Sequence, residues 1–146
     1  MFARDAKPQL IEEYVNTGKV RYVLKYFPFL GDESFLAAMA AECAGEQGSF
    51  WEYHDLLFSR WRGEGRGTFL PDKLKDYAQE LGLDTQAFGP CLDASRYEAT
   101  VMADKNQGQE KGVEYTPAIF INGKLSGAPR DYAELRAWIE EALASQ

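Results

Sequence analysis

The alternation of apolar and polar positions predicts a helix and a strand at the start of the chain. Apolar residues at helical spacing predict a helix over residues 2–17, and Gly18 supplies a stop signal. Residues 20–27 are rich in β-branched and aromatic side chains and end at Pro28, which predicts a strand. A helix that leads into a strand is half of a βαβ unit, so the pattern lacks the strand that should precede the helix.

The middle of the chain is helical by the same criterion. Two of the predicted helices open with a Ser-x-x-Glu capping box, at Ser49 and at Ser95. One has Pro71 in its first turn, where the missing N–H of proline costs nothing. The predicted helices cover residues 34–44, 49–60, 71–81, 84–93 and 95–111.

The C-terminal end changes to a hairpin followed by a helix. Asn122-Gly123 lies between the predicted strand segments 118–121 and 124–126, and this dipeptide is the strongest short-range hairpin signal. Asp131-x-x-Glu134 then provides the capping signal for a final amphipathic helix.

The order of these elements predicts one α/β domain whose sheet is interrupted by helices. We expect the sheet-forming part to combine residues 1–29 with residues 112–146. Residues 30–111 are then a helical insert. Sequence length supports this organisation, because 146 residues favour one domain.

Charge and composition narrow the functional classes. Hydrophobic residues make up 45% of the chain, which is enough for a real core. The formal net charge of −7 argues against nucleic acid or an anionic membrane as the main partner. No apolar run approaches the roughly 20 residues that span a bilayer. Charged residues among the first eight interrupt any signal-peptide core.

Cysteine and histidine are scarce, which limits the chemistry available. Cys43 and Cys91 are too far apart in sequence for a local redox motif, and His54 is the single histidine. We therefore predict no metal site and no cofactor. Two interpretations of the cysteines are open: a structural disulfide within the helical insert, or two buried free thiols.

Several segments, in order and almost end to end, carry a resemblance to a known family. They are residues 8–14 with 17–22, 40–48 with 50–58, 77–84 with Cys91-Leu-Asp93, and the Gly-Val-x-x-Thr-Pro-x-x-Phe-Ile-Asn-Gly run of residues 112–123. Together they resemble the DsbA-like thiol–disulfide oxidoreductases of the thioredoxin-fold superfamily. The resemblance implies a thioredoxin-like fold with an inserted helical domain, and a cysteine-containing or extended polypeptide as substrate. It also implies an extracytoplasmic location, although a cytoplasmic one stays open because no signal is present.

The chain departs from the family pattern at its start. In that family the first helix begins at a Cys-x-x-Cys, and the pattern puts the second cysteine just before Met1. We expect the first central strand and this motif to be missing, either by truncation at an internal methionine or because the chemistry was lost. No catalytic residue is therefore predicted, and enzymatic activity is left uncertain. The alternative function is a redox-dead peptide-binding module that uses the cis-proline groove.

The resemblance assigns one remaining site and one mode of association. Thr116-Pro117 is expected to be the family's cis-proline, and Tyr115, Thr116 and Pro117 are expected to bind substrate. A missing central strand would leave an unpaired edge on each of the predicted strands at residues 20–27 and 118–121, and an unpaired edge can bind a strand of another chain. We therefore expect the two edges to pair with each other, or a homodimer to form through them.

Overall fold

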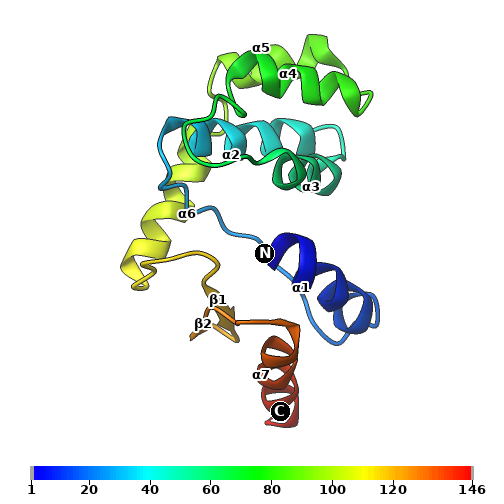
Figure 1. Ribbon diagram of the computed structural model, residues 1–146, viewed down its shortest axis with the longest axis vertical. Coiled ribbons are helices and arrows are strands. Elements are labelled where there is room, and N and C mark those ends of the chain that lie inside the picture. Colours follow the sequence, from blue (N-terminus) through cyan, green and yellow to red (C-terminus); the bar gives the residue numbers. More distant parts are fainter. Residues whose placement is uncertain (1, 146) are drawn as a thin grey trace. The chain divides into compact units, whose positions relative to one another are not determined.

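The structure, a computed structural model, describes residues 2–145 and divides into two compact units (Figure 1). The sheet unit combines residues 2–24 and 108–145, and the helical unit is Lys25–Gln107. In chain order the elements are α1 (Phe2–Leu10), the π-helix η1 (Ile11–Val15), α2 (Asp32–Gly45), α3 (Phe50–Arg60), α4 (Pro71–Glu80), α5 (Thr85–Asp93), α6 (Glu98–Glu110), β1 (Ile119–Ile121), β2 (Lys124–Gly127) and α7 (Tyr132–Ala144).

Helices α1, η1 and α7 form the core of the sheet unit. Their inward faces bury one cluster of side chains, because apolar residues recur every three or four positions on each helix. Two polar interactions between η1 and α7 add to this packing. The Tyr14 hydroxyl donates a hydrogen bond to Glu140, and the Arg136 guanidinium lies 3.6 Å from the Glu13 carboxylate. This hydrogen bond is the main cause that raises the pKa of Tyr14. The buried cluster consists of Ala6, Leu10, Tyr14, Leu135 and Ile139.

The sheet of the described residues has two strands, β1 and β2, paired antiparallel. The turn between them confirms the predicted hairpin. Asn122 and Gly123 have φ angles of 49° and 81°, the left-handed pair that a two-residue type I′ turn requires. A bulge between Ile119 and Phe120 shifts the register at the start of β1.

The predicted strand over residues 20–27 is wrong, and so is the prediction that it pairs directly with the hairpin. In the structure this segment is extended but belongs to no strand. It keeps the alternation of a strand, since Arg21 and Val23 are exposed whereas Tyr22 and Leu24 are half-buried. A strand is defined by its ladder, and residues 2–145 provide none for this segment. The described structure is therefore mostly helical, with a small two-stranded sheet.

Helix α2 is the centre of the helical unit, with α3, α4 and α5 packed on it. It is apolar around most of its circumference, as expected for a helix that is covered on several sides. The core continues into Tyr53 and Leu74, both fully buried, and the Tyr53 hydroxyl donates to the Leu74 carbonyl at 2.7 Å. Burial raises the pKa of Tyr53, so this phenol stays protonated as a donor.

Helix caps divide into those that form and those that do not. Asp84 accepts hydrogen bonds from the backbone at the start of α5, and Asp131 accepts one from Glu134 N at 2.9 Å at the start of α7. The predicted serine caps are wrong. Ser49 precedes α3 but makes no capping bond. Ser95 has a φ of 49° in the turn after α5, and α6 begins three residues later at Glu98.

Replacing Asp131, the residue that caps α7, tests whether this cap stabilises the sheet unit. We expect Asp131→Ala to destabilise the sheet unit by about 1 kcal/mol, because the Glu134 N–H loses its acceptor. Asp131→Asn should keep most of the stability, since asparagine is an equally good cap. Urea unfolding can follow this unit through Trp138, with Trp51 and Trp61 replaced by phenylalanine. Equal losses for both substitutions would show that the cap contributes nothing.

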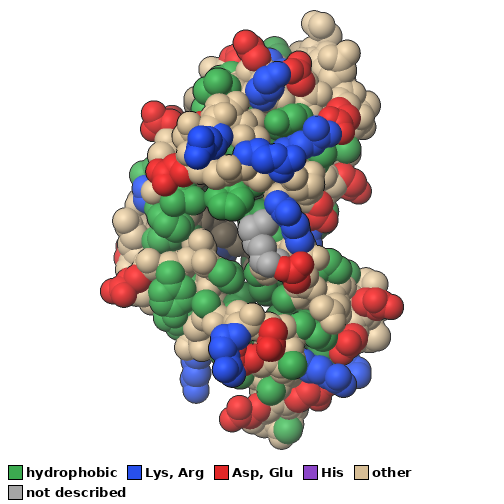
Figure 2. Space-filling model, viewed as in Figure 1, with side chains coloured by type: hydrophobic (Ala, Val, Ile, Leu, Met, Phe, Trp, Pro, Cys, Tyr) green, Lys and Arg blue, Asp and Glu red, His purple; other side chains and the backbone are tan. Residues whose placement is uncertain are grey.

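Charged side chains of both signs are interspersed on the visible face rather than separated into single-sign regions (Figure 2). No helix within residues 2–145 combines the length and the apolar character needed to cross a membrane.

Candidate functional site

A cavity of about 700 Å³ opens within the sheet unit beside Pro117. One wall is a single face of α1, because its four lining residues follow helical spacing. The opposite wall is the segment that leads into α7 and the first turns of that helix. The α1 wall is formed by Phe2, Asp5, Ala6 and Gln9, and the rest of the lining by Pro117, Pro129, Arg130, Asp131, Tyr132, Ala133 and Arg136.

The predicted substrate-binding residues form the loop that enters β1. The Thr116–Pro117 peptide bond is cis in the structure, and Tyr115 is 44% exposed. Pro117 lines the cavity, whereas Tyr115 and Thr116 do not. The Tyr115 hydroxyl lies beside Gly127 of β2, where an added Cβ would be 3.9 Å from it. The loop is thereby held against the far end of the hairpin.

The charges around the cavity are paired with one another. Arg130 lies 3.3 Å from Glu134, Asp131 caps α7, and Arg136 lies 3.6 Å from Glu13. Burial, together with the nearby Glu13 carboxylate, raises the pKa of Tyr132 to about 12, so its phenol is neutral at physiological pH. The lining offers no thiol. This arrangement can bind a chain by contact and by hydrogen bonds, but it has no nucleophile for disulfide exchange.

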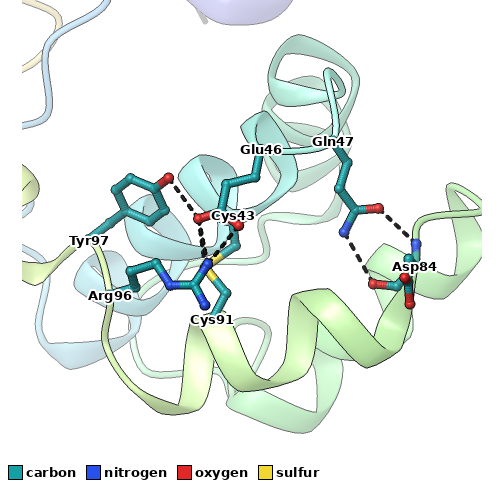
Figure 3. Close-up of a disulfide and its surroundings, with 7 residues drawn as sticks. All are labelled: Cys43, Glu46, Gln47, Asp84, Cys91, Arg96 and Tyr97. Carbon is teal, nitrogen blue, oxygen red and sulfur yellow. Dashed lines mark hydrogen bonds and ion pairs between the residues drawn. A yellow bond between two sulfur atoms is a disulfide. The ribbon is translucent and has the colours of Figure 1, made fainter.

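Both cysteines lie in the helical unit and are bonded to each other (Figure 3). Cys43 of α2 and Cys91 of α5 are each 1% exposed, and their Cα atoms are 6.0 Å apart. Of the two interpretations open from the sequence, the structure has the disulfide. It encloses a loop with a sequence separation of 48 residues, which ties α5 to the central helix.

A polar cluster beside the disulfide was not anticipated from the sequence (Figure 3). Glu46 accepts hydrogen bonds from Arg96 at 2.7 and 2.8 Å and from the Tyr97 hydroxyl at 2.9 Å. Hydrogen bonds from Arg96 hold the pKa of the Glu46 carboxyl below its usual value. The same carboxylate lies 3.9 Å from Cys91 Sγ, so the sulfur is covered by a charged pair as well as by the core.

His54 is an inward-facing member of the aromatic face of α3. It is 6% exposed, and its Nδ1 lies 2.8 Å from Asp55 Oδ1. Its ring packs 5.4 Å from the ring of Trp51 and 4.8 Å from that of Phe58. Across residues 2–145, no three or more His, Cys, Asp or Glu side chains gather as a metal site would require.

Sequence reasoning found the Tyr115–Pro117 loop but missed the cavity walls. The sequence does hold a pattern that could have indicated the α1 wall, because Phe2, Ala6 and Gln9 fall on one helical face. For the α7 wall the only such pattern is the helix cap at Asp131. That these two walls face each other depends on packing between helices more than a hundred residues apart, which no local pattern specifies.

Comparisons with known proteins identify relatives of nearly the whole chain. The family model described as thioredoxin matches residues 1–141. Disulfide bond formation protein D of Bacillus subtilis is 27% identical over 146 residues, covering 98% of this chain and 66% of that protein. The oxidised crystal structure of BdbD from Bacillus subtilis superposes with a TM-score of 0.88 at 27% identity, covering 98% of this chain and 79% of that one.

A second type of relative is a membrane transporter by name. Na(+)/H(+) antiporter NhaA 3 of Salinispora tropica is 33% identical over 146 residues, covering 99% of this chain and 22% of that protein. The chain thus spans about a fifth of the length of this relative and about two thirds of the disulfide protein. The match to the family model over nearly the whole sequence, with the close superposition on BdbD, shows that the chain belongs to the thioredoxin family, in its DsbA-like branch of thiol–disulfide oxidoreductases.

Proposed function

We propose that this chain is the substrate-binding scaffold of a DsbA-like thiol–disulfide oxidoreductase domain, and that its 146 residues alone do not catalyse disulfide exchange. One observation carries the proposal. The sequence has two cysteines, and both are bonded to each other and buried in the helical unit, whereas the cavity beside Pro117 is lined without a thiol.

The chemistry of exchange explains why a thiol is needed at the cavity. A thiolate attacks a sulfur of the substrate disulfide, and a second thiol then resolves the mixed disulfide. A helix N-terminus lowers the pKa of such a thiol through its dipole and free N–H groups. The first turn of α1 lines the cavity through Phe2 and Asp5. Neither side chain can form a thiolate.

The remaining parts of the site fit a polypeptide substrate. Tyr115 stands exposed on the loop before Pro117, where an extended cysteine-containing segment can lie against it. In this proposal the sheet unit is the thioredoxin part and the helical unit is its insert, near the predicted boundaries at residues 29/30 and 111/112. Disulfides form and persist outside the reducing cytoplasm, so the name of the Bacillus relative, a disulfide bond formation protein, supports an extracytoplasmic location.

A graft tests the proposal directly. A designed segment that supplies a strand and a Cys-x-x-Cys is fused before Phe2, and reduction of insulin by dithiothreitol is measured. We expect turnover from the graft, because it places a thiolate at the start of α1 next to the cavity. The unextended chain and a Ser-x-x-Ser version of the graft should stay at background.

Two results would contradict the proposal in different ways. Turnover by the unextended chain would show that Cys43 or Cys91 is catalytic after all. A grafted protein that folds and has two thiols accessible to a thiol reagent, but does not reduce insulin, would show that this chain is not the substrate-binding scaffold of such an enzyme.

A redox-dead peptide-binding module is the second candidate function. The exposed Tyr115 beside a cavity without a thiol favours it, since binding needs no sulfur chemistry. It predicts that extended peptides protect the Tyr115–Pro117 loop from hydrogen exchange even when the graft is inactive.

A further inference from the structure

A groove of about 390 Å³ lies between helices α2 and α6 of the helical unit. One wall is a single face of α2, because its lining residues follow one another at helical spacing. The other wall is the turn that precedes α6 together with the start of that helix. The lining consists of Asp32, Phe35, Leu36 and Met39 from α2, and of Ser95, Glu98 and Met102 from the other wall.

The floor of the groove is apolar and can adapt to a partner. Met39 is 6% exposed, and Phe35 and Leu36 pack against the same core from half-buried positions. Two of the three methionines in the chain, Met39 and Met102, line the groove. Methionine is unbranched and polarisable, so it fits apolar side chains of different shapes. Lys105 places its ammonium group 4.8 Å from the centre of the Phe35 ring, so this nearby cation already has a partner.

The rim of the groove is acidic. Asp32 lies in the first turn of α2 and Glu98 in the first turn of α6, and both are exposed. Neither carboxylate forms an ion pair within the part of the chain that the structure describes. Arg96, two positions before Glu98, is held by Glu46 at 2.7 Å instead. Two charges beside an apolar floor are therefore left for a basic partner to neutralise.

The walls favour a helical partner over an extended one. An extended peptide is bound through backbone hydrogen bonds to a strand edge, whereas the backbone groups of a helix interior bond within the helix. A partner helix satisfies its own backbone and presents apolar side chains three or four positions apart. The α2 wall, from Asp32 to Met39, spans about two helical turns, which suits two or three such side chains.

We propose that the groove between α2 and α6 binds an amphipathic helix of a partner polypeptide, with apolar residues on the face that enters the groove and basic residues beside them. The apolar residues lie over Met39 and Met102, and the basic residues pair with Asp32 and Glu98. A second copy of this chain fits less well, because each copy carries a formal net charge of −7. The inference goes beyond the proposed function, because it uses the helical unit and needs no thiol.

Binding of designed helices tests this proposal. The probe is a fluorescent sixteen-residue peptide with Leu at helical spacing on one face and Lys on the other. Its matched controls are a peptide of the same composition in which the Leu residues share no face, and a version with Glu for Lys. We expect the basic amphipathic peptide to bind the full chain and to shift the methyl NMR signals of Met39 and Met102. Both control peptides should bind at least about tenfold more weakly, since each loses one of the two complementary features.

Charge reversal on the rim separates this groove from general attraction to an acidic protein. Glu98→Lys should weaken binding of the basic peptide about fivefold, because an exposed ion pair is replaced by repulsion. Glu52→Lys is the matched control, since Glu52 is also an exposed acidic residue in the first turn of its helix, α3. It changes the net charge equally and should leave the affinity unchanged.

A polar substitution tests the floor in the same way. Met102→Gln keeps the length of the side chain and removes apolar surface, so binding should weaken about fivefold. Circular dichroism at 222 nm shows whether each variant is folded. The three peptides on the wild-type chain, with the Met39 and Met102 signals as readout, decide the proposal without any variant.

Three outcomes would overturn the proposal: no binding of the basic amphipathic peptide, equal binding of the permuted peptide, or equal losses for Glu98→Lys and Glu52→Lys. A dimer by light scattering whose formation shifts the Met39 and Met102 signals would assign the groove to a second copy, and would also overturn it. None of these results depends on the cysteine graft, so failure here is separate from failure of the proposed function.

Discussion

Replacing Cys43 and Cys91 together by alanine should lower the free energy of unfolding of the helical unit by about 4 kcal/mol. The disulfide encloses a loop with a separation of 48 residues. Cross-linking a loop of that length removes conformational entropy from the unfolded chain, which the chain-entropy relation places at roughly 4 kcal/mol. Both sulfurs are buried in the α2–α5 contact, so their loss also removes packing that alanine only partly restores.

Urea unfolding measured through Trp51 and Trp61 reports on the helical unit when Trp138 is replaced by phenylalanine. As a control, the wild type and the double variant are unfolded and refolded in strong reductant, which breaks the disulfide of the wild type. Their free energies of unfolding should then differ only by the packing of the two cysteine side chains. Alkylation supplies an independent check, because the native wild-type protein should resist labelling by iodoacetamide. An unchanged unfolding midpoint under oxidising conditions would show that the loop is not constrained by this bond.

Phe88→Ala should destabilise the same unit by about 3–5 kcal/mol. Phe88 is 1% exposed, and its ring lies 5.4 Å from that of Tyr53 in the core shared by α3 and α5. Truncation leaves a space of nearly a phenyl ring next to a tyrosine whose hydroxyl is fixed on the Leu74 carbonyl. That hydrogen bond limits how far the neighbours can move inward, so collapse of the cavity should be incomplete.

The matched control is Phe29→Ala, because Phe29 is 48% exposed and lies in the same unit. Its loss should cost less than about 1 kcal/mol, as is usual for surface positions. Phe88→Leu should fall between the two, since leucine fills part of the space. Urea titration of the three variants, followed by circular dichroism at 222 nm, gives the comparison. Equal costs for Phe88→Ala and Phe29→Ala would contradict the core position of Phe88.

The elements that the sequence predicted correctly are those determined by neighbouring residues. The Asn122-Gly123 turn forms because both residues tolerate positive φ. The Asp131 cap forms because a carboxylate two or three positions before free N–H groups reaches them directly. The α2 helix follows from its alanine-rich sequence, which contains no proline and reaches glycine only at its last residue, Gly45.

The errors concern contacts between distant residues. Residues 20–27 have strand propensity, yet a ladder partner is a property of the fold and not of the segment. Ser95 matches a capping pattern, but the exit from α5 puts it at positive φ, so α6 begins later. The pairing of Cys43 with Cys91 was left open rather than wrong, because it depends on how α5 packs against α2, which spacing alone does not determine.

The candidate site also combines a part that a local sequence pattern reveals with a part that depends on contacts between distant residues. The Tyr115–Pro117 loop was identified because a family pattern surrounds it, whereas the cavity beside it is built by α1 and α7 from opposite ends of the sequence. Polar partners such as Glu46 with Arg96 and Tyr97 are equally non-local.

The division of the chain into units has a consequence for its synthesis. The helical unit is one continuous stretch, Lys25–Gln107, so all of its sequence is synthesised before the second half of the sheet unit. Helix α1 is translated before the helical unit but packs on α7, which is translated after it. The apolar face of α1 therefore stays uncovered until α7 is translated, and nascent chains stalled before residue 132 should expose it to chaperones.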